Sequence, residues 1–201
     1  KRFAEVFGVA YSRHRELEQK EAQNRELTIQ NAIERVRAQA QGMQESAEIS
    51  GVTSMLFEEF EGLGYALTHS AIHLIDEEND SITYWITSSS SDRTLSGVPG
   101  APVHVPLDTA RSAGTLAVKA RGETHHTLEF PTRRDVEGFY VGARVAITGS
   151  TKKEARAYVR ERSLVRDYLA VHRVFHTHGM VAFGTSERWS DEDLAIAKRF
   201  T

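Results

Sequence analysis

Imidazole is the side chain with which this chain can do most chemistry, because the sequence holds nine histidines and no cysteine. His176 and His178 are two residues apart, so on an extended strand they share a face at about 6.6 Å, near enough for both rings to bind one ion. If the strand that carries His73 pairs beside them, the three rings form a cluster for a metal such as zinc or nickel. The alternative is that these rings are hydrogen-bonded groups on the half-exposed face of a sheet.

Other routes to catalysis are missing from the sequence. It contains no nucleophile elbow, phosphate-binding loop or paired metalloprotease histidines, so we expect no enzyme activity. The lack of cysteine excludes disulfides, thiolate ligands and thioether-linked cofactors, and it fits a reducing, cytoplasmic environment. The formal charge of −3 gives no electrostatic argument for a nucleic-acid partner. No apolar run approaches the roughly 18 residues that span a bilayer.

A small-molecule pocket is predicted on a β-hairpin, in which two β-rich runs, residues 70–75 and 82–87, flank an acidic turn. Alternate residues of a strand face opposite sides, so a first strand that packs Ile72 and Leu74 on helices turns its other residues toward a second face. We expect that face to combine an aromatic ring with few polar groups, as ligand sites do, beneath a serine-rich loop and a helix over 108–119. The candidate ligand-binding residues are Ala71, His73, Thr83, Trp85 and Thr87. The alternative is that Trp85 fills the core.

The remaining patterns complete an α+β fold. Further strands are predicted over 103–107, 122–130 and 171–186, with further helices over 49–64, over 151–169 and from Ser190 onward. This order predicts a central antiparallel sheet of five to six strands with helices mainly on one face. One helix carries Lys152, Arg156 and Arg160 at i, i+4 spacing. A solvated helix face is the favoured interpretation of this stripe, and contact with anions is the alternative.

Residues 1–44 predict one long helix, since they lack proline and are rich in charge. Its apolar residues repeat in steps of four and three, as in a coiled-coil seam, with a phase shift over the polar stretch 18–26. So narrow a stripe needs a partner, and we predict a homodimer through this helix; the alternative is that it folds back on its own domain. The chain thus divides into a linker helix (1–45) and a globular domain (46–201). The predicted dimer seam consists of Phe3, Phe7, Ala10, Leu17, Ile29, Ile33, Val36, Ala40 and Met43.

The tripeptide Lys-Arg-Phe occurs at residues 1–3 and again at 198–200, a spacing of 197 residues. A repeat at nearly the length of the chain predicts modules in tandem. The last helix of one module would then continue as the linker helix of the next.

Several stretches resemble the GAF family of sensory domains, in particular a GAF-like subgroup found as tandem copies in bacterial signalling proteins. These stretches are "KRFAEVF", "EAQNRELTIQNAIERVRAQAQGMQES", "LIDEENDSITYWIT" and "HGMVAFGTSERWSDEDLAIAKRF". The resemblance implies a GAF-like fold, a role in signal transduction, and adjacent signalling domains such as a histidine kinase or a cyclase. It implies no particular ligand. Covalent bilin attachment needs a cysteine, and the residues of the cyclic-nucleotide-binding subclass are not found.

The leading hypothesis is a non-catalytic sensory module that binds a small molecule or a partner and transmits its state through helical linkers to an output domain. A ligand-free dimerisation and spacer module is the second hypothesis. A histidine-based metal site with hydrolase activity is the third.

Overall fold

The computed structural model shows an α+β chain that begins with a long helix. It describes residues 2–88, 102–107 and 116–201, with side chains from Phe7 onward. The elements are α1 (Arg2–Gly42), the short 3₁₀ helix η1 (Ser46–Glu48), α2 (Ile49–Gly62), β1 (Leu67–Asp76), β2 (Ser81–Ser88), β3 (Val103–Pro106), β4 (His125–Phe130), α4 (Arg133–Thr148), α5 (Lys152–Glu161), β5 (Leu169–His176), β6 (Gly179–Thr185) and α6 (Asp191–Lys198).

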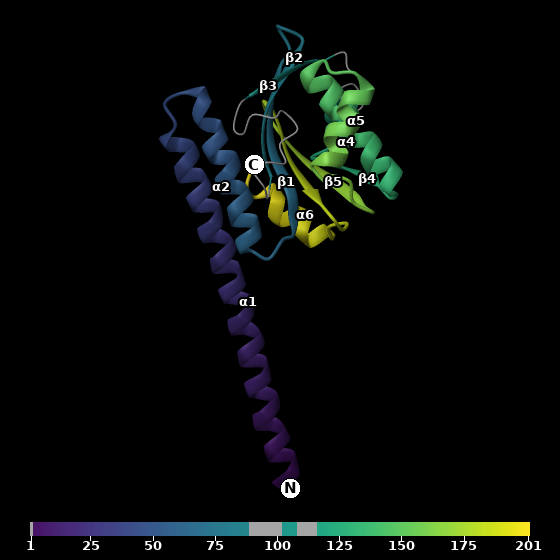
Figure 1. Cartoon of the computed structure of the whole chain (residues 1–201). Helices are drawn as coiled ribbons and strands as arrows, with labels where there is room; N and C mark the ends of the chain where they lie inside the picture. Colours follow the sequence, from purple (N-terminus) through teal and green to yellow (C-terminus); the bar gives the residue numbers. More distant parts are fainter. Residues whose placement is uncertain (1, 89–101, 108–115) are drawn as a thin grey trace.

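Six strands form one antiparallel sheet in the order β3-β2-β1-β6-β5-β4. On its first face lie α2, α6 and the C-terminal part of α1, and on its second face lie α4 and α5 (Figure 1). The α+β class, the antiparallel sheet and the long N-terminal helix are therefore confirmed. The prediction that helices gather mainly on one face is wrong. The reason is α4, a helix absent from the sequence prediction, which packs beside α5 on the second face.

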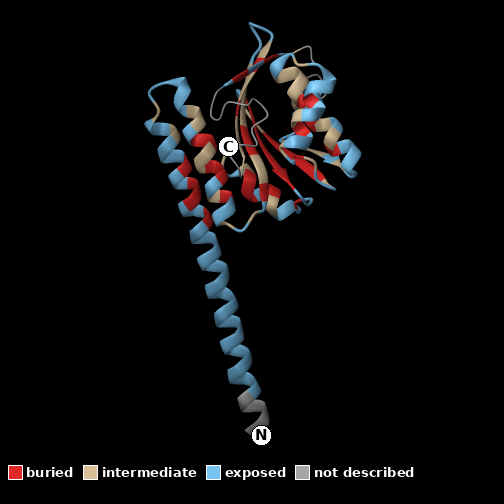
Figure 2. Ribbon diagram, in the orientation of Figure 1, coloured by how far each residue is buried: buried red, intermediate tan, exposed pale blue. Residues whose placement is uncertain are grey.

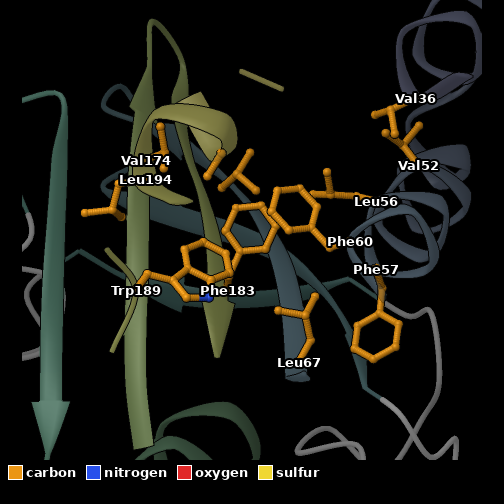
Figure 3. Close-up of a cluster of buried hydrophobic side chains, with 12 residues drawn as sticks. Val36, Val52, Leu56, Phe57, Phe60, Leu67, Val174, Phe183, Trp189 and Leu194 are labelled. Atoms are coloured by element: carbon orange, nitrogen blue, oxygen red, sulfur yellow. The ribbon is translucent and has the colours of Figure 1, made fainter. Parts of the chain in front are cut away.

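Aromatic rings fill the first face of the sheet. The fully buried Phe60 of α2 lies with its ring centroid 4.4 Å from that of Phe183 in β6 and 5.7 Å from that of Trp189, on which it stacks. Figure 3 shows these rings between α2 and the strands β5 and β6. Each buried aromatic side chain contributes about 2–3 kcal/mol through lost apolar surface, so this cluster is a main source of the domain's stability.

The second face is covered by two capped helices. At the start of α4, Thr132 Oγ1 accepts a hydrogen bond from the backbone N–H of Asp135, and Gly149 ends the helix with a φ of 65°. At the start of α5, Thr151 and Glu154 form a capping box. Below these helices lies an apolar cluster of Ala71, Val136, Tyr140, Val141, Ala155, Val159, Leu164, Leu169, Val171 and Ala182.

Two hairpins fix the register of the central strands. β1 and β2 are joined by the four-residue loop 77–80, and Asp76 opposes Ser81. β5 and β6 are joined by Thr177 and His178 alone. Gly179 is required here, because a Cβ at this position would collide with the backbone carbonyl of His73 in the neighbouring strand. The β1–β2 hairpin lies where the sequence predicts it, and the predicted strand region 171–186 forms most of the β5–β6 hairpin.

The two halves of α1 have different surroundings, as the burial colours of Figure 2 show. In the C-terminal half Ile29, Ile33 and Val36 are at most 7% exposed, packed on the globular domain. In the N-terminal half Phe7 is 68% exposed and Leu17 is 45% exposed. Within the described residues, no helix is both long and apolar enough to cross a bilayer.

The predicted dimer seam is therefore wrong for its second part. Ile29, Ile33 and Val36, together with Ala40 and Met43, belong to the core of their own chain. Here the helix folds back on its domain, which was the alternative interpretation. Phe7, Ala10 and Leu17 remain exposed, and Phe3 lies outside the described side chains.

Candidate functional site

The β1–β2 register divides the predicted ligand residues between the two faces of the sheet. Directly opposed residues of an antiparallel pair project to the same face, and Ile72 opposes Trp85 while His73 opposes Tyr84. Because Ile72 packs in the aromatic core, Trp85 lies on the first face together with the other two β2 candidates. Ala71 and His73 lie on the second face. The prediction that the five residues share one face is wrong, because the register places Trp85 opposite Ile72, which packs on the helices, and not on the face of His73.

The first-face candidates are held by contacts within the protein. Thr87 Oγ1 lies 3.1 Å from Ser54 Oγ of α2, and Thr83 Oγ1 lies 2.8 Å from His104 Nδ1 of β3. Trp85 is 5% exposed, and its indole Nε1 is buried with no hydrogen-bond partner among the described residues. This placement matches the alternative in which Trp85 fills the core.

The second face carries a buried guanidinium beside imidazole rings. Arg173 of β5 is only 8% exposed, and it lies between His126 of β4 and Ala182 of β6 in the strand register. His73 lies on β1, two strands away from Arg173 and two residues further along the register. Its ring stacks on that of Tyr84, with ring centroids 5.0 Å apart. We call His73, Tyr84, His126 and Arg173 the arginine face.

Burial sets the charges on the arginine face. Burial lowers the pKa of His126, and the nearby positive charge of Arg173 lowers it further, so the ring is neutral at pH 7. Its Nδ1 atom is buried and has no hydrogen-bond partner among the described residues. Arg173 carries a planar guanidinium, whose N–H donors match the geometry of carboxylate or phosphate oxygens. Arg173 and His126 can therefore bind an anionic or acceptor-rich group, and the stacked rings of His73 and Tyr84 lie two strands away on the same face.

The segments predicted to cover this face are described only in part. Residues 89–101 and 108–115, which include most of the serine-rich loop and the start of the predicted helix, lie outside the described residues. Residues 116–120 are helical, and Val118 among them is 5% exposed. Lys119 Nζ donates a 3.1 Å hydrogen bond to the carbonyl of Thr177, so this helical turn lies at the β5–β6 hairpin.

The predicted three-histidine metal cluster is not assembled. β5 ends at His176 and β6 begins at Gly179, so His178 lies in the turn and does not share a strand face with His176. On β6, the residue that opposes His73 is Met180. In the part of the chain that the structure describes, no group of three or more histidine, cysteine, aspartate or glutamate side chains could hold a metal ion.

One histidine that sequence reasoning left aside has a strongly lowered pKa. His172 is fully buried on the first face and stacks on Trp189, with ring centroids 4.5 Å apart and planes 2° from parallel. Its Nδ1 lies 3.0 Å from Thr127 Oγ1 and its Nε2 lies 3.1 Å from Thr185 Oγ1. Burial lowers the pKa of His172 to about 4, which keeps the ring neutral. The signal in the sequence was a histidine on the apolar side of a strand pattern.

Comparison with known proteins gives no family for this chain. No protein-family model matches it, and no curated protein matches it. The residues and their geometry are therefore the basis for any function assigned to it.

Proposed function

We propose that this chain is a non-catalytic, GAF-like sensory module of a cytoplasmic signalling protein. It binds a small molecule on the arginine face and passes the bound state to an output domain, such as a histidine kinase or a cyclase, through α1. The proposal combines the resemblance of the sequence stretches with two features of the fold, one for binding and one for transmission.

The binding role is carried by a single observation, the burial of Arg173 on a sheet face next to a neutral histidine. A charged group is costly to bury, and in structural cores the position is filled by an apolar residue. The guanidinium of Arg173 lies beside His126 in the strand register, and its planar N–H donors match the geometry of a ligand with a carboxylate or phosphate group. Binding would not require an ion or a covalent cofactor.

The transmission role rests on contacts that join the sheet to α1. Phe183 of β6 packs on Phe60 of α2, and Phe60 in turn lies 4.8 Å from Phe200, just after α6. Phe200 also packs against the buried residues of the C-terminal half of α1. Arg199 then donates hydrogen bonds of 2.6 and 3.0 Å to Glu26 of α1. A ligand that favours one arrangement of the strands would thereby favour one position of α1.

The exposed part of α1 favours a dimer. Phe7, Ala10 and Leu17 follow the coiled-coil spacing and are exposed on the surface of the single chain. A second copy of the same helix is the simplest partner. A spacer module without a ligand would use the same dimer, so the two functions differ only in what the arginine face does.

A ligand search tests the sensory function. Native mass spectrometry of the purified protein would show a bound molecule, and a thermal-shift screen of organic acids and phosphate esters would identify compounds that stabilise it. A ligand at one hundred times its dissociation constant stabilises the fold by about 2.7 kcal/mol, which raises Tm by about 5–10 °C for a domain of this size.

Variants locate the binding. Arg173→Met and, because a buried arginine can be needed for folding, the milder His126→Ala should both abolish the shift while the proteins stay folded by circular dichroism. A compound that stabilises the wild type and both variants equally would place the ligand elsewhere. If native mass spectrometry shows no bound molecule and no compound raises Tm, the sensory function is wrong and the ligand-free spacer function replaces it.

A further inference from the structure

Positive charge is concentrated in one layer of an acidic chain. Residues 133–166, which comprise α4, α5 and the segment after them, hold nine arginines and lysines against four aspartates and glutamates, a formal charge of +5. The whole chain has a formal charge of −3, so the remaining residues carry −8. This asymmetry favours an anionic partner for the α4–α5 layer and not for the rest of the molecule.

A cavity of about 580 Å³ lies within this layer, where α4 begins and α5 ends. Its volume falls in the range of small-molecule sites. Three of its lining residues are arginines that come from both helices, and one is a carboxylate. The lining residues are Arg133, Arg134, Glu137, Arg160, Ser163 and Val165.

One carboxylate organises the basic side chains around the cavity. Glu137 Oε1 lies 2.7 Å from Arg160 Nε and 3.7 Å from Arg156 Nε. The hydrogen bond from Arg160 is the main cause that lowers the pKa of Glu137, with further help from the charges of Arg160, Arg156 and Arg133. Glu137 is therefore ionised at neutral pH and holds the α5 arginines at the cavity, but it cancels only one positive charge.

The other two arginines are available to a ligand. Arg133 Nη1 lies 3.5 Å from a carboxylate oxygen of Asp167, whose side chain is 92% exposed, and ion pairs this open contribute little. Arg134 makes no ion pair or hydrogen bond with any residue that the structure describes. Both lie in the first turn of α4, next to each other on the rim of the cavity.

We propose that this cavity binds the phosphoryl group of a small organic molecule. Arg133, Arg134 and Arg160 donate hydrogen bonds to its oxygens, and the remaining volume holds the organic part. Guanidinium groups suit this role because their paired N–H donors match phosphate geometry. The site is separate from the arginine face, which lies on the strands β1, β2, β4 and β5. The stripe that contains Arg156 and Arg160 is thus part of an anion site and not only a solvated helix face.

Titration calorimetry with ribose 5-phosphate in low salt tests the proposal, with ribose as the uncharged comparison. We expect saturable binding of ribose 5-phosphate, no binding of ribose, and weaker binding as salt is raised, because exposed charges are screened. The variant Arg134→Glu should weaken binding by about tenfold or more, since it replaces a donor with a repelling charge. This variant should fold normally, because Arg134 has no described contact and an acidic residue suits the first turn of a helix.

The matched control is Arg37→Glu, a charge reversal at an exposed position on α1. Helix α1 lies on the other side of the sheet from α4 and α5, which line the cavity (Figure 1). The control variant should bind ribose 5-phosphate as the wild type does. Equal loss in Arg134→Glu and Arg37→Glu would mean that overall charge and not the cavity governs binding, and it would overturn the proposal. Absence of saturable binding by the wild type would overturn it as well. Because Arg173→Met leaves this cavity unchanged, its effect on the arginine face is measured independently.

Discussion

The two halves of α1 belong to one continuous helix, yet they have opposite surroundings. Residues such as Ile29, Ile33 and Val36 are buried against α2 and α6, whereas Phe7 and Leu17 are exposed on the same helix. Both halves show an apolar spacing of fours and threes. Such a spacing therefore indicates only that an apolar stripe will be buried. Whether its partner is the same chain or another one depends on which surfaces lie beside it in the fold.

The largest effect should come from a charge placed in the buried half. Ile33→Asp puts a carboxylate where the wild-type side chain is 5% exposed, so we expect it to lower the free energy of unfolding by about 3–5 kcal/mol. The matched change in the exposed half, Phe7→Asp, should leave the unfolding of a dilute sample within about 0.5 kcal/mol of the wild type. Urea unfolding followed by circular dichroism measures both. Similar losses in the two variants would abolish the distinction between the halves.

Acid should act on the packed domain and not on the exposed half of the helix. An unfolded histidine has a pKa of about 6.5, and burial lowers that of His172 to about 4. Between these values the unfolded state binds more protons, so the free energy of unfolding should fall as pH drops from 6.5 toward 4, by up to about 3 kcal/mol. His172→Gln should flatten this pH profile. His14→Gln, at an exposed position in α1, is the control and should show the same pH profile as the wild type. If His172→Gln also showed the wild-type profile, the role given to the burial of His172 would be contradicted.

The smallest effect on folding, but a specific one on assembly, should come from the exposed stripe. Phe7→Glu combined with Leu17→Glu should weaken dimerisation by about a hundredfold, because both residues lie in the predicted seam. Light scattering would follow the mass from twice 22.5 kDa toward 22.5 kDa. Leu27→Glu is the control, since Leu27 is 61% exposed but outside the seam. A wild type that stays monomeric at high concentration would show that this stripe has no second copy as partner.

Local patterns in the sequence predicted most elements correctly, and long-range placement produced the errors. The caps at Thr151 and Ser190 and both hairpin turns are local signals, and the structure contains them. The helix α4 was missed because Gly138 and Gly142 interrupt its pattern, and glycine disfavours helix unless tertiary packing offsets the cost. Its N-terminal cap, Thr132 followed by Asp135, was the signal that could have identified it.

The candidate site was harder to predict than the fold. The pairing of β1 with β2 decides which residues share a face, and it places Trp85 opposite Ile72, in the core and not at the expected site. Arg173 attracted no attention in the sequence, because a lone arginine in a strand is ordinarily exposed. Only the order of the strands shows that β5 is an interior strand of the sheet, where a charged side chain is buried.

Only the C-terminal half of α1 is attached to the domain, so the N-terminal half projects from it like a lever arm. Residues 2–24 extend beyond Arg25 and Glu26, which interact with the domain, for about 35 Å at 1.5 Å per residue (Figure 1). A tilt of the anchored half by about 5° would therefore move the far end by about 3 Å, while side chains near the anchor move by a fraction of that. The helix thus converts a small rearrangement in the packed core into a displacement of its far end that is close to the distance between two atoms in van der Waals contact.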